Sequence, residues 1–256
     1  MRSILVLASL MVACALPARA EPTLFARYDW HDGATDVSGS PIRHDGILQP
    51  GASISGGKLH FDGWDGVALG HVPDLAGATQ VHFRFEDVTF DKHGDGGPTC
   101  HSPVLIGDAM SWRAGVFFDL PPYGDRTQIQ FSIFDWPNSL GISVTVADAV
   151  VDHFDSIEYR FDGSAPVAQR LAVRWNDGPW MTGAEGSDAV KTIPTAESVQ
   201  INNGCSADED PLWGSVGQVS LYSDQVPEPA AGWVLMGPAL LFIRRNRRGI
   251  SLGDRS

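Results

Sequence analysis

The chain has 256 residues, with 31 acidic and 18 basic side chains for a formal net charge of −13, and it is rich in glycine (28) and proline (17). Its hydrophobic fraction of 43% is too high for a disordered chain, and neither glycine nor proline recurs with a collagen-like period. The acidic balance argues against nucleic acid as a partner, because phosphate binding relies on clustered Lys and Arg. The composition therefore indicates an acidic globular protein rich in turns, with one large domain or two small ones.

The first 20 residues have the pattern of a secretory signal peptide. Arg2 supplies a positive start, residues 4–16 are apolar, and an A-x-A pattern ends at Ala20. We therefore expect cleavage after Ala20 and export of the rest of the chain. A buried first helix and a lipoprotein signal ending at Cys14 are the weaker alternatives.

The C-terminal residues 224–256 combine three features in a fixed order. Val226-Pro227-Glu228-Pro229 predicts an extended peptide, because two prolines block both helix and sheet pairing. An apolar segment over 230–243 follows, which is shorter than the roughly 20 residues that cross a bilayer comfortably. A basic cluster then follows, and the positive-inside rule would hold it in the cytoplasm; its members are Arg244, Arg245, Arg247 and Arg248.

This tripartite tail resembles the PEP-CTERM sorting signal of Gram-negative bacteria. The resemblance implies processing by an exosortase-type enzyme and an inner-membrane intermediate held by a short hydrophobic helix over 230–243. It also implies a final location at the cell surface or in an extracellular matrix of exopolysaccharide or biofilm. The eight residues after the arginines make a longer tail than this signal usually has. An ordinary membrane anchor is the alternative.

The region between the two ends is more acidic than the whole chain. Residues 1–20 and 226–256 carry seven of the basic residues and two of the acidic ones, which leaves 29 acidic against 11 basic residues in between, a charge of −18. Only two cysteines remain there, Cys100 and Cys205, and in an oxidising compartment such a pair predicts a disulfide. Two separate buried thiols are the alternative.

Residues 21–223 are expected to form a single all-β domain. Apolar residues alternate with polar ones at period two from end to end, and Asp-Gly turn signals separate the runs. About a dozen such strands without a linker or repeat predict an antiparallel two-sheet β-sandwich. The clearest runs are Leu24, Ala26, Tyr28 and Trp30; Val81, Phe83 and Phe85; Trp112, Ala114, Val116 and Phe118; Ile129, Phe131 and Ile133; Ile157, Tyr159 and Phe161; and Leu171, Val173 and Trp175.

Short motifs near both ends of this domain resemble the concanavalin A-like, laminin-G-type domains. An aromatic strand precedes the loop Asp36-Val37-Ser38-Gly39, and Gly57-Lys58-Leu59-His60-Phe61-Asp62-Gly63 follows it. Residues 217–222 occupy the place of the closing strand. The resemblance implies a jelly roll that binds sugars or proteins, often with Ca²⁺, and that also serves some glycosidases.

Catalytic patterns are missing from the predicted domain. A retaining glycosidase on this fold needs two carboxylates about 5 Å apart, which an E-x-D-x-E strand would supply, and no such strand occurs. Glu158, between Ile157 and Tyr159, is expected on a solvated strand face. Nor does the predicted domain, residues 21–223, contain G-x-S-x-G, H-E-x-x-H or a P-loop. We therefore expect a non-catalytic protein.

Two acidic loops are candidates for a Ca²⁺ site. Asp91 and Asp95 lie in a glycine-rich loop, and Asp208, Glu209 and Asp210 follow Cys205. Ca²⁺ prefers six to eight oxygen ligands, so neither segment alone completes a shell. A Cys100–Cys205 bridge would bring the two loops together. Solvated turn aspartates are the simpler interpretation.

Three tryptophans beside turn signals are candidates for stacking on sugar rings: Trp136, Trp180 and Trp213. Packing under their own loops is the alternative for each of them. The strand positions of Trp30, Trp112 and Trp175 predict core residues instead.

The sequence as a whole indicates an exported, non-catalytic, carbohydrate-binding or structural protein of the surface or matrix. Its charge favours a neutral glycan or one bridged by Ca²⁺. A polysaccharide hydrolase or lyase on the same fold and a protein-binding adhesin are the alternatives.

Overall fold

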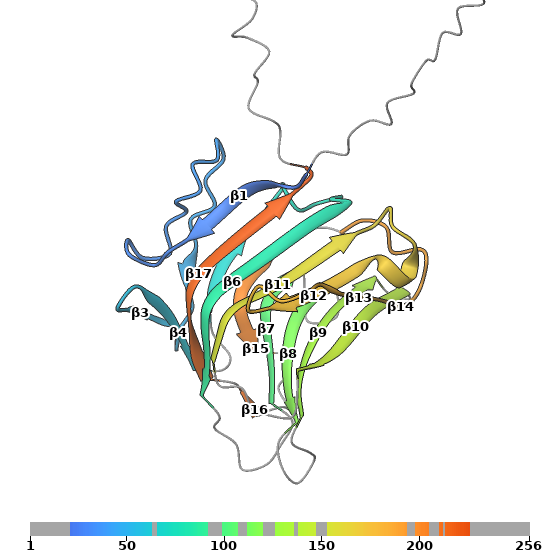
Figure 1. The fold of residues 1–256 in the computed structure, drawn as a ribbon. Helices are drawn as coiled ribbons and strands as arrows, with labels where there is room; N and C mark the ends of the chain where they lie inside the picture. The colour runs from blue at the N-terminus through green and yellow to red at the C-terminus, as the bar shows by residue number, and fades with distance from the viewer. Residues whose placement is uncertain are drawn as a thin grey trace, which may run out of the picture.

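The computed structural model of the protein describes residues 21–62, 66–91, 99–106, 112–119, 126–135, 138–146, 153–193, 198–204, 210–211 and 213–225. These residues form two stacked β-sheets, named sheet A and sheet B here (Figure 1). The expected all-β, antiparallel two-sheet architecture is therefore confirmed. The predicted signal peptide and residues 226–256 of the predicted sorting signal lie outside the described residues.

Sheet A has eight strands in the described residues, in the order β13-β12-β11-β6-β17-β4-β3, with β1 also paired to β17. Its strands are β1 (Thr23–Tyr28), β3 (Ser53–Ser55), β4 (Lys58–Asp62), β6 (Gln80–Asp91), β11 (His153–Asp162), β12 (Leu171–Trp175), β13 (Met181–Gly183) and β17 (Trp213–Ser223).

Sheet B has nine strands in the described residues, in the order β14-β10-β9-β8-β7-β15-β5-β2, with β16 paired to β7. Its strands are β2 (Ile47–Leu48), β5 (Val67–Gly70), β7 (Thr99–Ile106), β8 (Trp112–Asp119), β9 (Arg126–Asp135), β10 (Asn138–Val146), β14 (Glu185–Gly186), β15 (Val199–Gly204) and β16 (Asp210–Pro211).

The long strand β17 holds the N-terminal part of the chain to the centre of sheet A. One edge of β17 pairs with β6 along most of its length, while the other pairs first with β4 and then with β1. Figure 1 shows β1, β17, β6 and β11 side by side in this layer. All described pairings are antiparallel except that of β16 with β7. The last strand therefore joins both ends of the domain, as expected for a closing strand over residues 217–222.

The core lies between the two sheets and follows the period-two pattern. Val81, Phe83 and Phe85 of β6 are buried and pair with the buried face of β11. The inward residues of β9 face them from sheet B, where Phe131 packs edge-on against Tyr159. Successive side chains of a strand point to opposite faces. The alternation therefore predicted this part of the core correctly.

The first strand departs from the expected alternation. A register shift between Leu24 and Ala26 turns Phe25 inward, where it is fully buried, while Leu24 is only partly buried. A β-bulge adds one residue to a strand and so changes which side chains face the core. Trp30 is buried as predicted, but it lies beyond the end of β1 with a positive φ of 60°.

The loop that follows β1 is held together by Asp36, the first residue of the predicted loop motif. Its carboxylate accepts hydrogen bonds from the backbone N–H groups of Arg27, Ser38 and His44, at 3.1, 2.8 and 3.1 Å. A carboxylate that accepts several backbone N–H groups fixes a loop without any ligand. The motif therefore has a structural role in this chain.

Helical structure is scarce in the described part of the chain. A 3-10 helix, η1 (Val167–Gln169), connects β11 to β12. Within the described ranges, no helix has the length and apolarity needed to cross a membrane.

Candidate functional site: a charged network, an aromatic band and a groove

The outer face of sheet A carries polar side chains from four neighbouring strands. His82, Arg84 and Glu86 alternate along β6 with the buried apolar residues and therefore point away from the core. In register with Arg84 lie Glu158 of β11 on one side and Ser220 of β17 on the other. Glu158 in turn pairs with Arg174 of β12. The sheet therefore places one carboxylate directly between two arginines.

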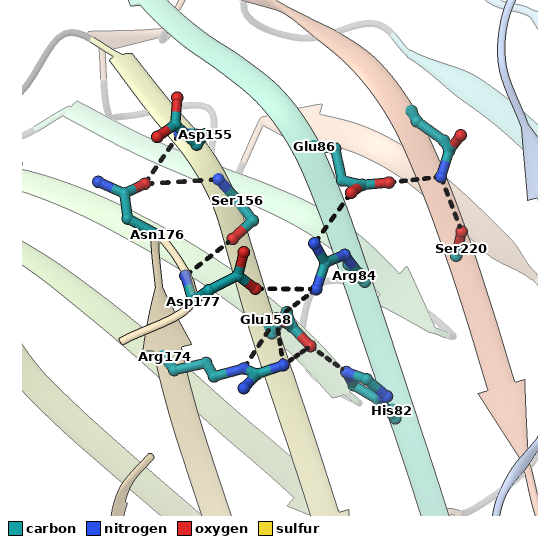
Figure 2. A network of polar contacts seen from close by, with 11 residues as sticks. His82, Arg84, Glu86, Asp155, Ser156, Glu158, Arg174, Asn176, Asp177 and Ser220 are labelled. Carbon is teal, nitrogen blue, oxygen red and sulfur yellow. Dashed lines mark hydrogen bonds and ion pairs between the residues drawn. The ribbon is translucent and has the colours of Figure 1, made fainter. Parts of the chain in front are cut away.

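Glu158 is the centre of this network (Figure 2). Its carboxylate accepts hydrogen bonds from Arg84 Nη1 at 2.9 Å and from Arg174 Nε and Nη2 at 2.8 and 3.0 Å. His82 Nε2 lies 2.6 Å from Oε2. Because an ionised carboxylate only accepts hydrogen bonds, Nε2 of His82 carries a proton. Both carboxylate oxygens of Glu158 therefore accept hydrogen bonds from arginine or histidine N–H groups.

The expectation that Glu158 faces solvent is wrong, because its side chain is 0% exposed. It does point away from the core, as the alternation predicted, but long arginine side chains from both neighbouring strands close over it. Arginine stems cover surface in this way while their guanidinium groups stay polar.

The pairing keeps Glu158 ionised at neutral pH. Burial on its own raises the pKa of the carboxyl, but hydrogen bonds from His82 and Arg174 and the nearby charge of Arg84 lower it to about 2. A general acid needs a pKa near the working pH. Glu158 is therefore a structural anion and does not suit acid catalysis.

The network extends outward through Arg84 and the turn after β12. Arg84 also contacts the carboxylates of Glu86 and Asp177, at 2.9 and 3.2 Å. Asn176 and Asp177 both have positive φ, near 50°, and the side-chain oxygen of Asn176 accepts hydrogen bonds from the backbone of β11. The Asp-Gly turn predicted from the sequence thus positions a carboxylate against Arg84.

An aromatic band crosses the same face. Tyr222 of β17 stacks on His82, with ring centroids 5.1 Å apart, and the ring of Trp180 lies edge-on to His82 at 5.9 Å. The guanidinium carbons of Arg160 and Arg174 each lie 4.5 Å from the Trp180 centroid. Trp180 is only partly buried. Of the three candidate tryptophans, it is the one whose side-chain position is described, and it packs on arginines of the sheet.

A groove of about 950 Å³ lies between β13 at the edge of sheet A and β10 of sheet B. One wall comes from β9 and β10 of sheet B, and the other from η1 and the β13–β14 segment. Its lining is rich in hydroxyl and amide groups, and the described lining contains a single carboxylate, Glu185. The lining residues are Gln130, Ser132, Ser139, Leu140, Gly141, Ile142, Ser143, Val144, Thr145, Ala168, Met181, Thr182, Gly183, Ala184 and Glu185.

The other predicted site residues fall mainly outside the described parts of the chain. Trp136, Asp95, Asp208, Glu209 and Cys205 are in this group, as is the sorting signal. The backbone at Asp91, Cys100, Asp210 and Trp213 is described. Within the described residues, no three His, Cys, Asp or Glu side chains are grouped so as to hold a metal ion.

Strand residues that flank the two proposed metal loops are described. Asp91 at the end of β6 pairs with Trp213, and Asp210 of β16 pairs with Thr99 of β7. Gly204, the residue before Cys205, pairs with His101, the residue after Cys100. The Ca²⁺ site and the disulfide stay predictions.

No family model and no curated protein sequence matches this chain. Solved structures do match, and they place its fold in the concanavalin A-like class of β-sandwiches. The binding domain of botulinum neurotoxin DC in complex with SialylT matches with a TM-score of 0.54 and 10% identity, over 77% of this chain and 46% of that one. The same binding domain in complex with rat synaptotagmin II matches with a TM-score of 0.52 and 8% identity, over 78% and 48%.

A third neighbour is the receptor binding domain of botulinum neurotoxin mosaic serotype C/D, with a tetraethylene glycol molecule bound on its Hcn sub-domain. It matches with a TM-score of 0.52 and 8% identity, over 85% of this chain and 51% of that one. The chain thus spans about half the length of these toxin chains. At such low identity the similarity establishes the fold and leaves the ligand to be argued from the site.

Proposed function

We propose that the protein is an exported, non-catalytic carbohydrate-binding protein, with the groove between β10 and β13 as its glycan site. The observation that carries the proposal is the lining of this groove. Six of its residues offer hydroxyl or amide groups, and they are Gln130, Ser132, Ser139, Ser143, Thr145 and Thr182. Such groups match the alternating donors and acceptors of sugar hydroxyls.

The size and composition of the groove support this proposal. Small-molecule sites commonly have volumes of about 300–1,000 Å³ and combine apolar walls with a few convergent polar groups. Val144 and Met181 supply apolar surface here, and Met181 is 41% exposed. Two of the three tryptophans predicted to stack on sugars flank these walls in the sequence. Trp136 lies in the connection between β9 and β10, and Trp180 immediately precedes β13.

The arrangement of carboxylates favours binding over hydrolysis. A glycosidase site needs two carboxyl groups on either side of the scissile bond, whereas the described lining offers only Glu185. Glu158 is held as a buried anion on the other side of β13. The alternative of a hydrolase or lyase therefore has the weaker support.

Blocking the groove tests the proposal directly. Thr145→Trp and Ser139→Trp put a bulky ring on exposed positions of β10, and Ser55→Trp on β3 is the matched control on an exposed position of the other sheet. Glycan-array screening of the wild-type protein should find an oligosaccharide. Calorimetric titration should then show at least tenfold weaker binding by both groove variants and unchanged binding by the control. Equal binding by all four proteins would contradict the assignment.

The sequence motifs in residues 1–20 and 226–256 support a location for this activity outside the cytoplasm. We propose that the signal peptide directs export, and that an exosortase-type enzyme processes the Val226-Pro227-Glu228-Pro229 tail and delivers the protein to the surface or matrix. Replacing Pro227 and Pro229 by alanine should leave the protein in the inner-membrane fraction as an uncleaved form, detected by immunoblot. An identical distribution of wild type and variant would contradict this route.

A further inference from the structure

Arg160 differs from the other arginines on the outer face of sheet A. Its side chain is exposed, and its guanidinium carbon lies 4.5 Å from the centre of the Trp180 ring. Arg84 and Arg174 are both paired with Glu158. Among the described residues, no carboxylate lies within ion-pair distance of Arg160. Its charge is therefore available to a ligand.

The surroundings of Arg160 favour an anion in spite of the acidity of the whole protein. Two acidic residues lie two positions from Arg160 along β11. Glu158 is already surrounded by Arg84, Arg174 and His82, and the carboxylate of Asp162 accepts hydrogen bonds from the turn that follows it. Interactions between exposed charges are largely screened beyond about 8–10 Å at physiological ionic strength. A small anionic group on Arg160 therefore interacts mainly with this local arrangement and much less with the net charge of the domain.

Contact with Trp180 prepares Arg160 for binding. A guanidinium over an aromatic ring is held by the ring's electrostatic field, while its N–H donors stay free to form two parallel hydrogen bonds to a carboxylate. Because the side chain is already restricted, less conformational entropy is lost when a ligand binds.

The register of sheet A connects this arginine to the groove. Tyr222 pairs with His82, His82 with Arg160, Arg160 with Ala172, and Ala172 with Thr182. Thr182 lines the groove. Neighbouring strands are about 4.8 Å apart, so the backbones of Arg160 and Thr182 are separated by about 10 Å. A single extended oligosaccharide that binds in the groove can therefore pass around β13 and reach Arg160.

From this arrangement we infer that Arg160 and Trp180 form a subsite for an acidic sugar, with the carboxylate of a uronic acid on the guanidinium and the pyranose ring against the aromatic band. The inference rests on the proposed carbohydrate binding and specifies its ligand as an acidic polysaccharide. The aromatic band favours a sugar over an acidic peptide, because the C–H face of a pyranose packs on aromatic rings. The subsite revises the preference for neutral glycans that net charge alone suggested.

The test compares a hexuronic acid tetrasaccharide with its carboxyl-reduced, neutral counterpart. We expect the full-length wild-type protein to bind the acidic form at least tenfold more tightly, and Arg160→Gln to remove this difference. Arg160→Lys should keep part of it, because lysine retains the charge and loses the paired geometry. Arg43→Gln is the control, because Arg43 is an exposed arginine already paired with Asp45. Circular dichroism and thermal melting confirm that each variant is folded.

The outcomes separate this inference from the proposed function. Equal binding of both tetrasaccharides by wild type and Arg160→Gln would overturn the acidic subsite and leave carbohydrate binding intact. Failure of the wild type to bind any glycan, on the array or in solution, would overturn both. Binding of poly-glutamate as tight as that of the uronide, with the same loss in Arg160→Gln, would overturn the assignment to a sugar.

Discussion

Arg174 donates hydrogen bonds from two nitrogens to the buried carboxylate of Glu158, from Nε to Oε1 at 2.8 Å and from Nη2 to Oε2 at 3.0 Å. This pair joins β12 to β11 on the outer face of sheet A, and Arg84 of β6 completes it from the other side. Three neighbouring strands are thus linked by one charge. The link lies beside the proposed acidic subsite and fixes Arg174, one of the two arginines on which Trp180 packs.

Replacing Glu158 by Gln should destabilise the protein by about 3 kcal/mol. Removing one member of a buried ion pair leaves its partners with uncompensated charge, which typically costs about 3–5 kcal/mol. Urea denaturation followed by tryptophan fluorescence measures this change. Glu185→Gln, at an exposed carboxylate, should change the free energy of unfolding by less than about 0.5 kcal/mol. Equal effects of the two substitutions would contradict the role of Glu158.

The same carboxylate should make the stability of the fold depend on acid pH. Its pKa is lowered from 4.5 to about 2 in the folded protein. The stabilisation is therefore fully present above pH 4.5 and is lost as the pH falls toward 2, because the unfolded chain takes up the proton first. Melting temperature measured from pH 7 to pH 2 should fall less steeply for Glu158→Gln than for the wild type. Parallel curves would mean that other carboxylates carry the acid sensitivity.

Two buried tyrosines should respond in opposite ways to loss of the hydroxyl. Tyr159 is fully buried, and its hydroxyl is without a hydrogen-bond partner in the described structure, whereas the hydroxyl of Tyr28 donates to the carbonyl oxygen of His44 at 2.5 Å. An unsatisfied buried polar group costs free energy, while a satisfied one stabilises by about 1 kcal/mol. Tyr159→Phe should therefore be neutral or stabilising, and Tyr28→Phe destabilising by about 1 kcal/mol, in chemical denaturation. The reverse order would show that the two hydroxyl environments are misassigned.

Cys100 and Cys205 should form a disulfide when the protein is produced in an oxidising compartment. The pairing of Gly204 with His101 brings the residue before Cys205 opposite the residue after Cys100. Mass spectrometry of peptides released under non-reducing conditions should detect one cross-linked pair. Alkylation of two free thiols without prior reduction would contradict the bond. If the bond forms, reduction should lower the free energy of unfolding by about 2–5 kcal/mol.

Much of the fold could be predicted because alternation is a local signal. The buried sets on β6, β9 and β11 are largely visible as every second residue. The alternation shifts by one residue at Asp87 of β6, after which Val88 and Phe90 are buried, as it does at Phe25 of β1. The outward set His82, Arg84 and Glu86 was visible in the same strand. Its partners Glu158 and Arg174 could not be identified from the sequence, because they lie on other strands and the sequence does not give the register between strands.

The candidate site was harder to predict for the same physical reason. The groove is made from β9 and β10 together with the β13–β14 segment, which are brought together only by the stacking of the two sheets. Trp180 was identified from its turn, whereas its packing on Arg160 depends on the pairing of β11 with β12. Residues that act together across strands can be recognised only once the strand order is known.

Mapping of an oligosaccharide onto backbone amides by NMR tests the central claim most directly. On titration with the best glycan from the array, the account predicts that the largest chemical-shift changes fall on groove residues such as Gly141, Ser143 and Thr182, while Ser55 on β3 is unaffected. Shifts confined to strands away from the groove, or no shifts with any glycan, would contradict carbohydrate binding at this site.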